Sequence, residues 1–336
     1  DDAEINSVLF HPQDDHVQAV ATCYLRSAWT CLDPQIETTF ATLREAQPYD
    51  ADIKIVSQSH DNATWIVAYI SDVASPQYYL LDRNHNTIHH LFNAKPEMDQ
   101  YTLSPMHPVE ITARDGITLP SYLTIPAEYK QHNTAYIPHQ PLPLVLLVHG
   151  GPHARDNWGN DPVTQWLANR GYAILSVNYR GSVGFGVHLT QAGFGEWGNK
   201  MHNDLIDAIN WAISNGIADK EKIGIMGGSY GGYATLVGLT MTPDVFACGV
   251  DIVGPSNLVT LINSIPPYWK PIRSLFTRLV GGDPEIEEQR PILEQKSPIT
   301  YVDNITKPLL IAQGKNDPRV KQAESDQIVA AMQAKD

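Results

Sequence analysis

The sequence is short of basic residues and of long apolar runs. Its 336 residues hold 23 lysines and arginines against 37 aspartates and glutamates, a formal net charge of −14. Binding to phosphate backbones or to anionic membrane surfaces needs a basic face, so nucleic acid and membranes are poor candidate partners. The longest apolar run, Leu144–Val148, is far shorter than the roughly 20 residues that span a bilayer.

Cysteine is also scarce, because only Cys23, Cys31 and Cys248 are present and they are widely scattered. This usage argues against a disulfide framework and fits a reducing compartment. The first ten residues contain no basic segment followed by an apolar block, which is the pattern of a signal peptide. We therefore expect a cytoplasmic protein, and the sequence leaves its oligomeric state open.

Two regions differ in their hydrophobic pattern. Within residues 1–105, short β-branched and aromatic runs separated by polar turns predict an antiparallel meander at 64–70, 77–82 and 87–91. Three strands are marginal alone, so further strands must join them. After a strand pair at 109–112 and 122–125, buried strands alternate with helices such as 203–215, which predicts a doubly wound parallel α/β sheet. These buried strands are expected at 144–148, 173–177, 222–226, 248–253 and 308–312.

The strongest motif is Gly227-x-Ser229-x-Gly231, which lies between a predicted strand and a predicted helix. A nucleophile on such a turn adopts strained backbone angles, and side chains two positions before and after it would collide. Glycine at both positions removes the collision, and the helix directs its first N–H groups at a developing oxyanion. The alternative is a glycine-rich turn without catalysis, but this placement favours Ser229 as a nucleophile.

A second motif, His149-Gly150-Gly151-Pro152-His153, directly follows the first buried strand. Acyl transfer needs a second oxyanion donor, and a glycine loop after an early strand lets the backbone approach the substrate closely enough. We predict Gly151 N–H and Tyr230 N–H as the donor pair. His149 and His153 are expected to organise the loop, since the base follows the acid in the chain order of this fold.

A third feature places Asp317 on the loop after the last predicted strand. A carboxylate there orients the imidazole of the base and stabilises it when protonated. The alternative for Asp317 is a turn-forming or helix-capping role. Asp251, which belongs to the preceding strand, is the second candidate for the acid.

A general base is missing from its expected place. All 13 histidines lie between His11 and His202, so none follows Ser229. We expect that the chain ends before this histidine, and that the 336-residue polypeptide is inactive or nearly so. No P-loop, dinucleotide fingerprint or zinc-ligand spacing of histidines is present, so neither a cofactor nor a metal is expected.

Taken together, four motifs resemble the prolyl oligopeptidase family of serine peptidases (family S9), with the acylaminoacyl-peptidase branch as the nearest match. They are residues 149–153, 178–186, 227–233 and 316–320. The resemblance implies an α/β-hydrolase domain at 106–336, truncated before its base histidine, and the C-terminal blades of a β-propeller at 1–105. It further implies that Ser229 is the nucleophile, Asp317 the acid, and Gly151 with Tyr230 the oxyanion donors, acting on short peptides.

Two other functions stay open at this stage. A carboxylesterase or lipase-type hydrolase uses the same fold, although the β-meander and the tyrosine-rich nucleophile turn favour a peptidase. A non-catalytic protein that has lost its base is the third hypothesis, and a histidine encoded shortly after Asp336 would argue against it. The sequence leaves open the side-chain preference at the cleavage site and the choice between exopeptidase and endopeptidase.

Overall fold

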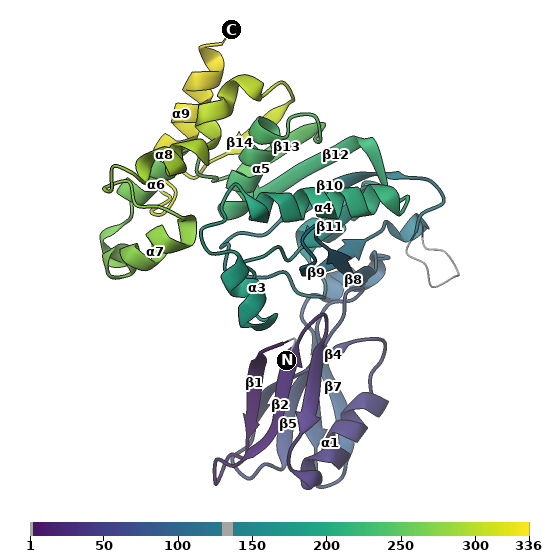
Figure 1. Ribbon diagram of the computed structural model, residues 1–336. Helices are drawn as coiled ribbons and strands as arrows, with labels where there is room; N and C mark the ends of the chain where they lie inside the picture. Colours follow the sequence, from purple (N-terminus) through teal and green to yellow (C-terminus); the bar gives the residue numbers. More distant parts are fainter. Residues whose placement is uncertain (1–2, 130–136, 336) are drawn as a thin grey trace.

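Two antiparallel sheets form the first part of the computed structural model, which describes residues 3–129 and 137–335 (Figure 1). The strand order is β1-β2-β3 in one sheet and β4-β5-β6-β7 in the other. Strands β5, β6 and β7 are the predicted meander, which is confirmed, and β4 supplies the further strand that it needs. The bounds are β1 (Ile5–Phe10), β2 (Val17–Cys23), β3 (Ser27–Cys31), β4 (Asp52–Gln58), β5 (Thr64–Ile70), β6 (Gln77–Asp82) and β7 (Thr87–Asn93).

Helix α1 (Pro34–Glu45) crosses from the first sheet to the second and was not predicted. Asp33 caps its N-terminus by accepting a hydrogen bond from the Gln35 N–H. The helix buries Phe40 among the aromatic residues of the N-terminal core, where the Phe40 ring makes edge contact with that of Trp65. It is therefore the packing of one apolar stripe on the sheet that stabilises this helix.

The larger part of the chain forms one seven-stranded sheet with the order β14-β13-β12-β10-β11-β9-β8. Strands β8 and β9 make the predicted antiparallel pair, and β10 to β14 run parallel to one another. The predicted doubly wound sheet is therefore confirmed. The bounds are β8 (Met106–Thr112), β9 (Thr118–Thr124), β10 (Leu142–Val148), β11 (Ala173–Val177), β12 (Ala218–Gly228), β13 (Cys248–Ile252) and β14 (Leu309–Ala312).

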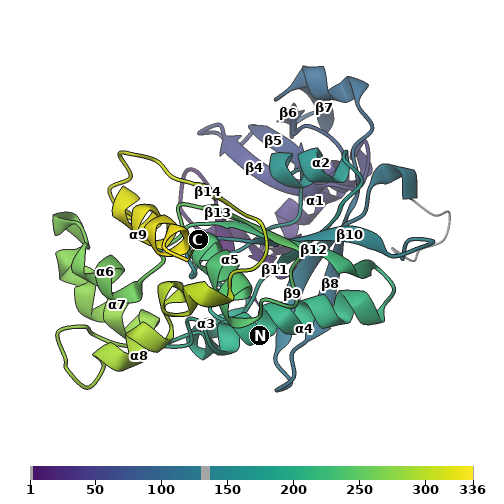
Figure 2. The same ribbon diagram turned by 90° about the horizontal axis from the view of Figure 1, so that it is seen from above.

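Helices cover both faces of this sheet, as the view from above shows (Figure 2). Leu144, Leu146 and Val148 of β10 join the main core with α4 and α5, whereas Val145 and Leu147 face α2 on the opposite side. This alternation explains why β10 reads as a continuous apolar run. The helices are α2 (Pro162–Ala168), α3 (Gly186–Ala192), α4 (Lys200–Ser214), α5 (Tyr230–Met241), α6 (Leu258–Asn263), α7 (Arg273–Val280), α8 (Arg290–Gln295) and α9 (Gln322–Gln333), with 3₁₀ turns η1 (Pro96–Gln100), η2 (Ala127–Tyr129), η3 (Pro267–Ile272) and η4 (Pro298–Asn304). Among the described residues, no helix has the length and apolar character needed to cross a membrane.

The strand order brings two distant motifs together. Strand β10 lies between β11 and β12. The chain therefore passes from β10 to its neighbour β11 on one side and then crosses back to β12 on the other side. In open α/β sheets such a reversal opens a crevice at the carboxyl ends of the strands, where ligands bind. Val148 at the end of β10 pairs with Gly227 near the end of β12, which puts the His149–His153 loop beside the Ser229 turn.

A buried ion pair fixes the turn that follows β11. Arg180 donates from Nε and Nη2 to the Asp204 carboxylate of α4, at 2.8 and 2.7 Å, and the Asp204 side chain is fully buried. Its Nη1 and Nη2 also donate to Asp115 in the β8–β9 turn, at 2.9 and 3.0 Å. One guanidinium thus links β11, α4 and the β8–β9 turn.

Replacing Arg180 is expected to be costly, because it leaves the buried Asp204 carboxylate without its cation. We expect Arg180→Gln to lower the free energy of unfolding by about 3–5 kcal/mol in urea titrations. Arg114→Gln is the matched control, since Arg114 also joins the β8–β9 turn to α4 through Asp207 but is 53% exposed. The control should lose no more than about 1 kcal/mol, and equal losses in the two variants would contradict this account.

Candidate active site

Ser229 occupies the sharp turn between β12 and α5. Its backbone angles are φ 56° and ψ −116°, a conformation that residues other than glycine rarely adopt. The Ser229 N–H donates to the Ile252 carbonyl at 2.8 Å, and its own carbonyl accepts from the Tyr233 N–H at 3.0 Å. The Ser229 side chain is exposed and its hydroxyl makes no hydrogen bond with a described residue. The strained turn therefore holds this hydroxyl outward.

The flanking glycines are required by contact with β10. A β-carbon built on Gly227 would lie 2.5 Å from the Val148 carbonyl oxygen and 2.6 Å from the Gly231 carbonyl carbon. A β-carbon on Gly231 would come closer still to the same Val148 oxygen. By contrast, a β-carbon on Gly228 would meet only the Ile252 carbonyl oxygen, at 3.8 Å. The two positions of the Gly-x-Ser-x-Gly pattern are thus the crowded ones.

The loop after β10 packs directly against the serine. A β-carbon on Gly150 would lie 2.9 Å from the Gly228 carbonyl oxygen and 3.4 Å from the Ser229 β-carbon. Gly151 has φ +119°, a conformation that favours glycine. Within the described part of the chain, the N–H groups of Gly151 and Tyr230 form no hydrogen bond, and Tyr230 N–H is the first of α5. Both amides are therefore free to donate to a ligand.

His149 holds this loop in place through hydrogen bonds and ring stacking. Its ring stacks on that of Tyr179 with centroids 4.5 Å apart. Burial lowers the pKa of His149 to about 4, so the ring is neutral at pH 7. Its Nδ1–H donates to the Gly150 carbonyl at 2.8 Å, and Nε2 accepts from the Ser182 hydroxyl at 3.0 Å. Both nitrogens are occupied, which agrees with the loop-organising role expected from the sequence.

His153 has a similar place at the other end of the loop. Its Nδ1 lies 2.8 Å from the Gly181 carbonyl, to which it donates, and burial lowers the pKa of its imidazole. The two histidines therefore fasten the glycine loop to the turn after β11, which contains Gly181 and Ser182. Neither forms a hydrogen bond with Ser229.

The two candidate carboxylates differ in exposure. Asp317, on the loop after β14, is partly exposed, and its Oδ1 accepts from the N–H groups of Arg319 and Val320 at 2.8 and 3.0 Å. Its Oδ2 has no hydrogen-bond partner among the described residues. Asp251 of β13 is fully buried, and a β-carbon on Gly232 in the first turn of α5 would collide with it. Only Asp317 thus offers an accessible oxygen.

Asp251 is held in an apolar setting that favours its neutral form. Its Oδ1 accepts from the Gly254 N–H at 2.8 Å, whereas Oδ2 is buried without a partner. Burial raises the pKa of Asp251 to about 7. The carboxyl group therefore carries a proton in the folded protein under mildly acidic conditions.

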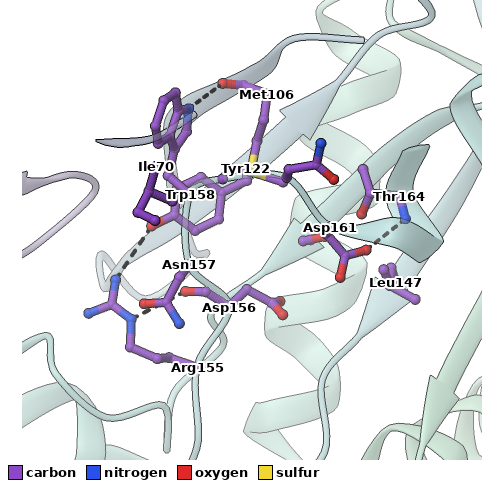
Figure 3. A pocket seen from close by; sticks show the side chains of 13 residues that line it. Ile70, Met106, Tyr122, Leu147, Arg155, Asp156, Asn157, Trp158, Asp161 and Thr164 are labelled. Atoms are coloured by element: carbon purple, nitrogen blue, oxygen red, sulfur yellow. Dashed lines mark hydrogen bonds between the residues drawn. The ribbon is translucent and has the colours of Figure 1, made fainter. Parts of the chain in front are cut away.

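A cavity of about 350 Å³ lies where the N-terminal sheets meet the seven-stranded sheet, and Ile70 of β5 lines it together with residues that follow β10 (Figure 3). Burial raises the pKa of Asp156 in its wall to about 7, with the neighbouring Asp161 as a second cause. Arg155 reaches across the junction and donates to the carbonyls of Cys23 and Tyr24 at 2.6 and 2.7 Å. The sequence did not reveal this junction, because the Arg155–Asp161 segment that forms much of the cavity wall carries no recognised motif.

Substituting the crowded glycine should disturb the turn, whereas its neighbour should tolerate the change. Gly227→Ala is expected to lower the free energy of unfolding by about 1–3 kcal/mol, since the new methyl group overlaps the Val148 carbonyl. Gly228→Ala should stay within about 1 kcal/mol of the parent protein. Urea unfolding followed by circular dichroism measures both, and a Gly228→Ala loss as large as that of Gly227→Ala would argue against this steric explanation.

The raised pKa of Asp251 predicts a pH dependence of stability. The folded state holds this proton up to about pH 7, but the unfolded chain releases it near pH 3.9, so Asp251 makes the protein less stable as pH rises between these values. In Asp251→Asn this contribution disappears. The free energy of unfolding of the variant minus that of the parent should therefore increase from pH 4.5 to pH 8. The contributions of all other titratable groups are the same in both proteins and cancel in this difference. A difference that is flat or falls with pH would exclude a neutral Asp251.

Comparisons with known proteins complete the description of the site. The model of the prolyl oligopeptidase family matches residues 158–336. Over 99% of its length the chain is 52% identical to dipeptidyl aminopeptidase BIII of Pseudoxanthomonas mexicana and 44% identical to dipeptidyl peptidase family member 6 of Caenorhabditis elegans, of which it covers 48% and 47%. The fold is similar to that of Pyrococcus horikoshii acylaminoacyl peptidase, with a TM-score of 0.74 and 21% identity over 99% of this chain and 50% of that one. The chain therefore spans about half the length of the curated relatives that it matches.

Proposed function

Because the chain belongs to the prolyl oligopeptidase family, we propose that it is the part of a serine peptidase that hydrolyses short peptides through an acyl-enzyme on Ser229. The family model covers more than half of the 336 residues, including the whole nucleophile turn. One observation carries the proposal. The exposed Ser229 side chain stands at a positive φ between β12 and α5, with a glycine loop packed against it.

The chemistry follows the usual course of acyl transfer. The Ser229 hydroxyl attacks the peptide carbonyl, and the N–H groups of Gly151 and Tyr230 hold the oxyanion that forms. The amine product leaves, and water then releases the acyl group from Ser229. These donors are supported by two amides that have no partner among the described residues and that belong to the loop and the helix that meet at Ser229.

Asp317 is the proposed acid that orients the base. It follows β14, and the loops after β12 and β14 leave the same edge of the sheet. Its Oδ1 is anchored by two backbone N–H groups, which leaves Oδ2 to accept from an imidazole. Asp251 lacks an exposed oxygen and is the weaker candidate.

The proposed base is a histidine that follows Asp317 in chain order, as in other enzymes of this fold. All 13 histidines of the sequence precede Ser229, and His149 and His153 are engaged in bracing the loop. We therefore expect the 336-residue polypeptide alone to hydrolyse peptides orders of magnitude more slowly than an enzyme with that histidine.

The domain boundary proposed near residue 105 coincides with the connection between β7 and β8. Residues 106–336 would be the catalytic domain, and 1–105 would contribute blades of a β-propeller that restricts access to short peptides. The four-stranded antiparallel sheet β4–β7 has the strand number of one blade, which supports this assignment. The cytoplasmic location expected from the scarcity of cysteine also stays a prediction.

We expect the enzyme to act at free N-termini. Two relatives that match along almost the entire chain are named as a dipeptidyl aminopeptidase and a dipeptidyl peptidase family member, whereas the similarity to an acylaminoacyl peptidase at 21% identity concerns the fold. The sequence motifs, by contrast, favoured the acylaminoacyl branch. The substrates of these two classes differ in whether the N-terminal amino group is free or acylated. A dipeptidyl peptidase requires the free amino group that an acylaminoacyl peptidase rejects.

The intact enzyme should release p-nitroaniline from dipeptidyl p-nitroanilides, and Ser229→Ala should lower kcat/KM by about 10⁴-fold or more, because the nucleophile is lost. Asp317→Asn should cause a loss on the order of 10⁴-fold, since the base imidazole loses its orienting carboxylate. Asp326→Asn, an exposed substitution on α9, is the matched control and should leave kcat/KM unchanged. A large loss in Asp251→Asn without one in Asp317→Asn would transfer the role of the acid to Asp251.

The same assay distinguishes the alternatives. N-acetylation of the dipeptide should abolish cleavage if a free N-terminus is required, and faster cleavage of the acetylated substrate would identify an acylaminoacyl peptidase. Efficient hydrolysis of p-nitrophenyl esters without any peptide cleavage would identify a carboxylesterase. Absence of both activities in the intact protein would identify a non-catalytic member of the family.

A further inference from the structure

Two histidines and an aspartate converge on one point in the turn between β1 and β2. His11 Nδ1 lies 3.1 Å from Asp14 Oδ1, and His16 Nδ1 lies 2.6 Å from the same oxygen. The two imidazole rings are stacked, with centroids 5.1 Å apart and planes at 15°. Three donor atoms from a six-residue stretch thus gather within 4.8 Å of one another, although the sequence spacing suggested no metal site.

The backbone of the turn holds the three side chains in place. The His11 N–H donates to the His16 carbonyl at 2.8 Å, and the Asp15 N–H donates to the His11 carbonyl at 3.0 Å. Asp15 takes a positive φ of 58°, which lets the chain reverse between the two histidines. The side-chain nitrogen and oxygen atoms of the cluster are therefore positioned by the hydrogen-bonded ends of β1 and β2.

A second carboxylate orients one of the histidines. His16 Nε2 lies 3.3 Å from Asp33 Oδ2. Asp33 is itself anchored, because its Oδ1 accepts from the Gln35 N–H at the N-terminus of α1. At 2.6 Å from the Asp14 carboxylate, His16 Nδ1 carries a proton that it donates to Asp14 Oδ1. Metal binding releases such a proton, and the Nδ1 lone pair then points toward Asp14 and His11 while Nε2–H donates to Asp33. Carboxylates that pair with the outer nitrogen of a histidine in this way are typical of metal-binding histidines.

The surroundings of the turn are acidic. Asp33 and Asp61 line the adjoining groove of about 730 Å³. The groove lining has three carboxylates, those of Asp14, Asp33 and Asp61, against one guanidinium, that of Arg83, which donates to Thr39 Oγ1 and to the Asn62 carbonyl. The local charge therefore favours a bound cation.

We propose that His11 Nδ1, Asp14 Oδ1 and His16 Nδ1 bind a divalent transition-metal ion of the Zn²⁺ class, with Asp33 orienting His16. Two imidazole nitrogens and one carboxylate suit Zn²⁺, Ni²⁺ or Cu²⁺, whereas Mg²⁺ and Ca²⁺ prefer oxygen ligands throughout. Water completes the tetrahedral set.

The site lies at the end of the N-terminal sheets away from the seven-stranded sheet (Figure 1), so the ion takes no part in the chemistry at Ser229. Instead it connects the β1–β2 turn to the N-terminus of α1 through His16 and Asp33. Its effect is therefore on the stability of the N-terminal region, since a ligand that binds only the folded state stabilises that state.

The test uses the intact, untagged protein after removal of metals with a chelator. We expect Zn²⁺ to bind at this site and to raise the Tm, and Mg²⁺ to leave the Tm unchanged. His16→Gln should abolish the Zn²⁺-dependent rise in Tm. Asp33→Asn should weaken Zn²⁺ binding by about 10–100-fold in calorimetry, and it preserves the helix cap because asparagine caps equally well.

His85→Gln is the matched control, because His85 also pairs with an aspartate in a strand turn, Asp82 at 2.8 Å, but without a second histidine. It should bind Zn²⁺ like the parent protein. Cobalt(II) spectra exclude cysteine ligands, since binding here should give no thiolate charge-transfer band. A Zn²⁺ effect that persists undiminished in His16→Gln, or an affinity unchanged in Asp33→Asn, would overturn the proposal. The Tm of each variant without metal verifies that it is folded.

Discussion

The contact between two backbones, at the ends of β10 and β12, is the constraint on which the site depends. The Val148 carbonyl occupies the space that side chains at positions 227 and 231 would need. Beside this contact the turn after β12 takes the positive φ of Ser229, and the loop after β10 lies against the Ser229 β-carbon. Strand pairing thus determines where the hydroxyl and the free amides are placed.

Buried polar groups keep this contact in register. Both ring nitrogens of His149 form hydrogen bonds and the ring stacks on that of Tyr179, so the glycine loop cannot rotate without losing those contacts. Arg180 extends the same support to α4 and to the β8–β9 turn through two carboxylates. The glycines provide the space, and these polar contacts provide the rigidity.

The sequence predicted the parts of the fold in which a strand is buried on both faces of the sheet or a motif lies within a few consecutive residues. Most of the parallel strands contain short apolar runs, and the serine turn carries its glycines within five residues, so both were recognised. Helix α1 was missed because only one narrow stripe of it is apolar and threonines fill much of the rest. The His11, Asp14 and His16 cluster was also missed, since a hairpin, and not a regular spacing, brings its members together. The junction around Asp156 depends on tertiary contacts alone.

Arg155 lies two residues after His153, and its guanidinium also packs 3.9 Å from the centre of the Phe185 ring. Through the carbonyls of Cys23 and Tyr24, it joins the segment that follows the His149–His153 loop to the hairpin between β2 and β3. Any motion of the N-terminal sheets relative to the seven-stranded sheet must therefore break these two bonds or pull on the segment that follows Gly151. Arg155 thus couples the position of the N-terminal sheets to the loop that lies against Ser229.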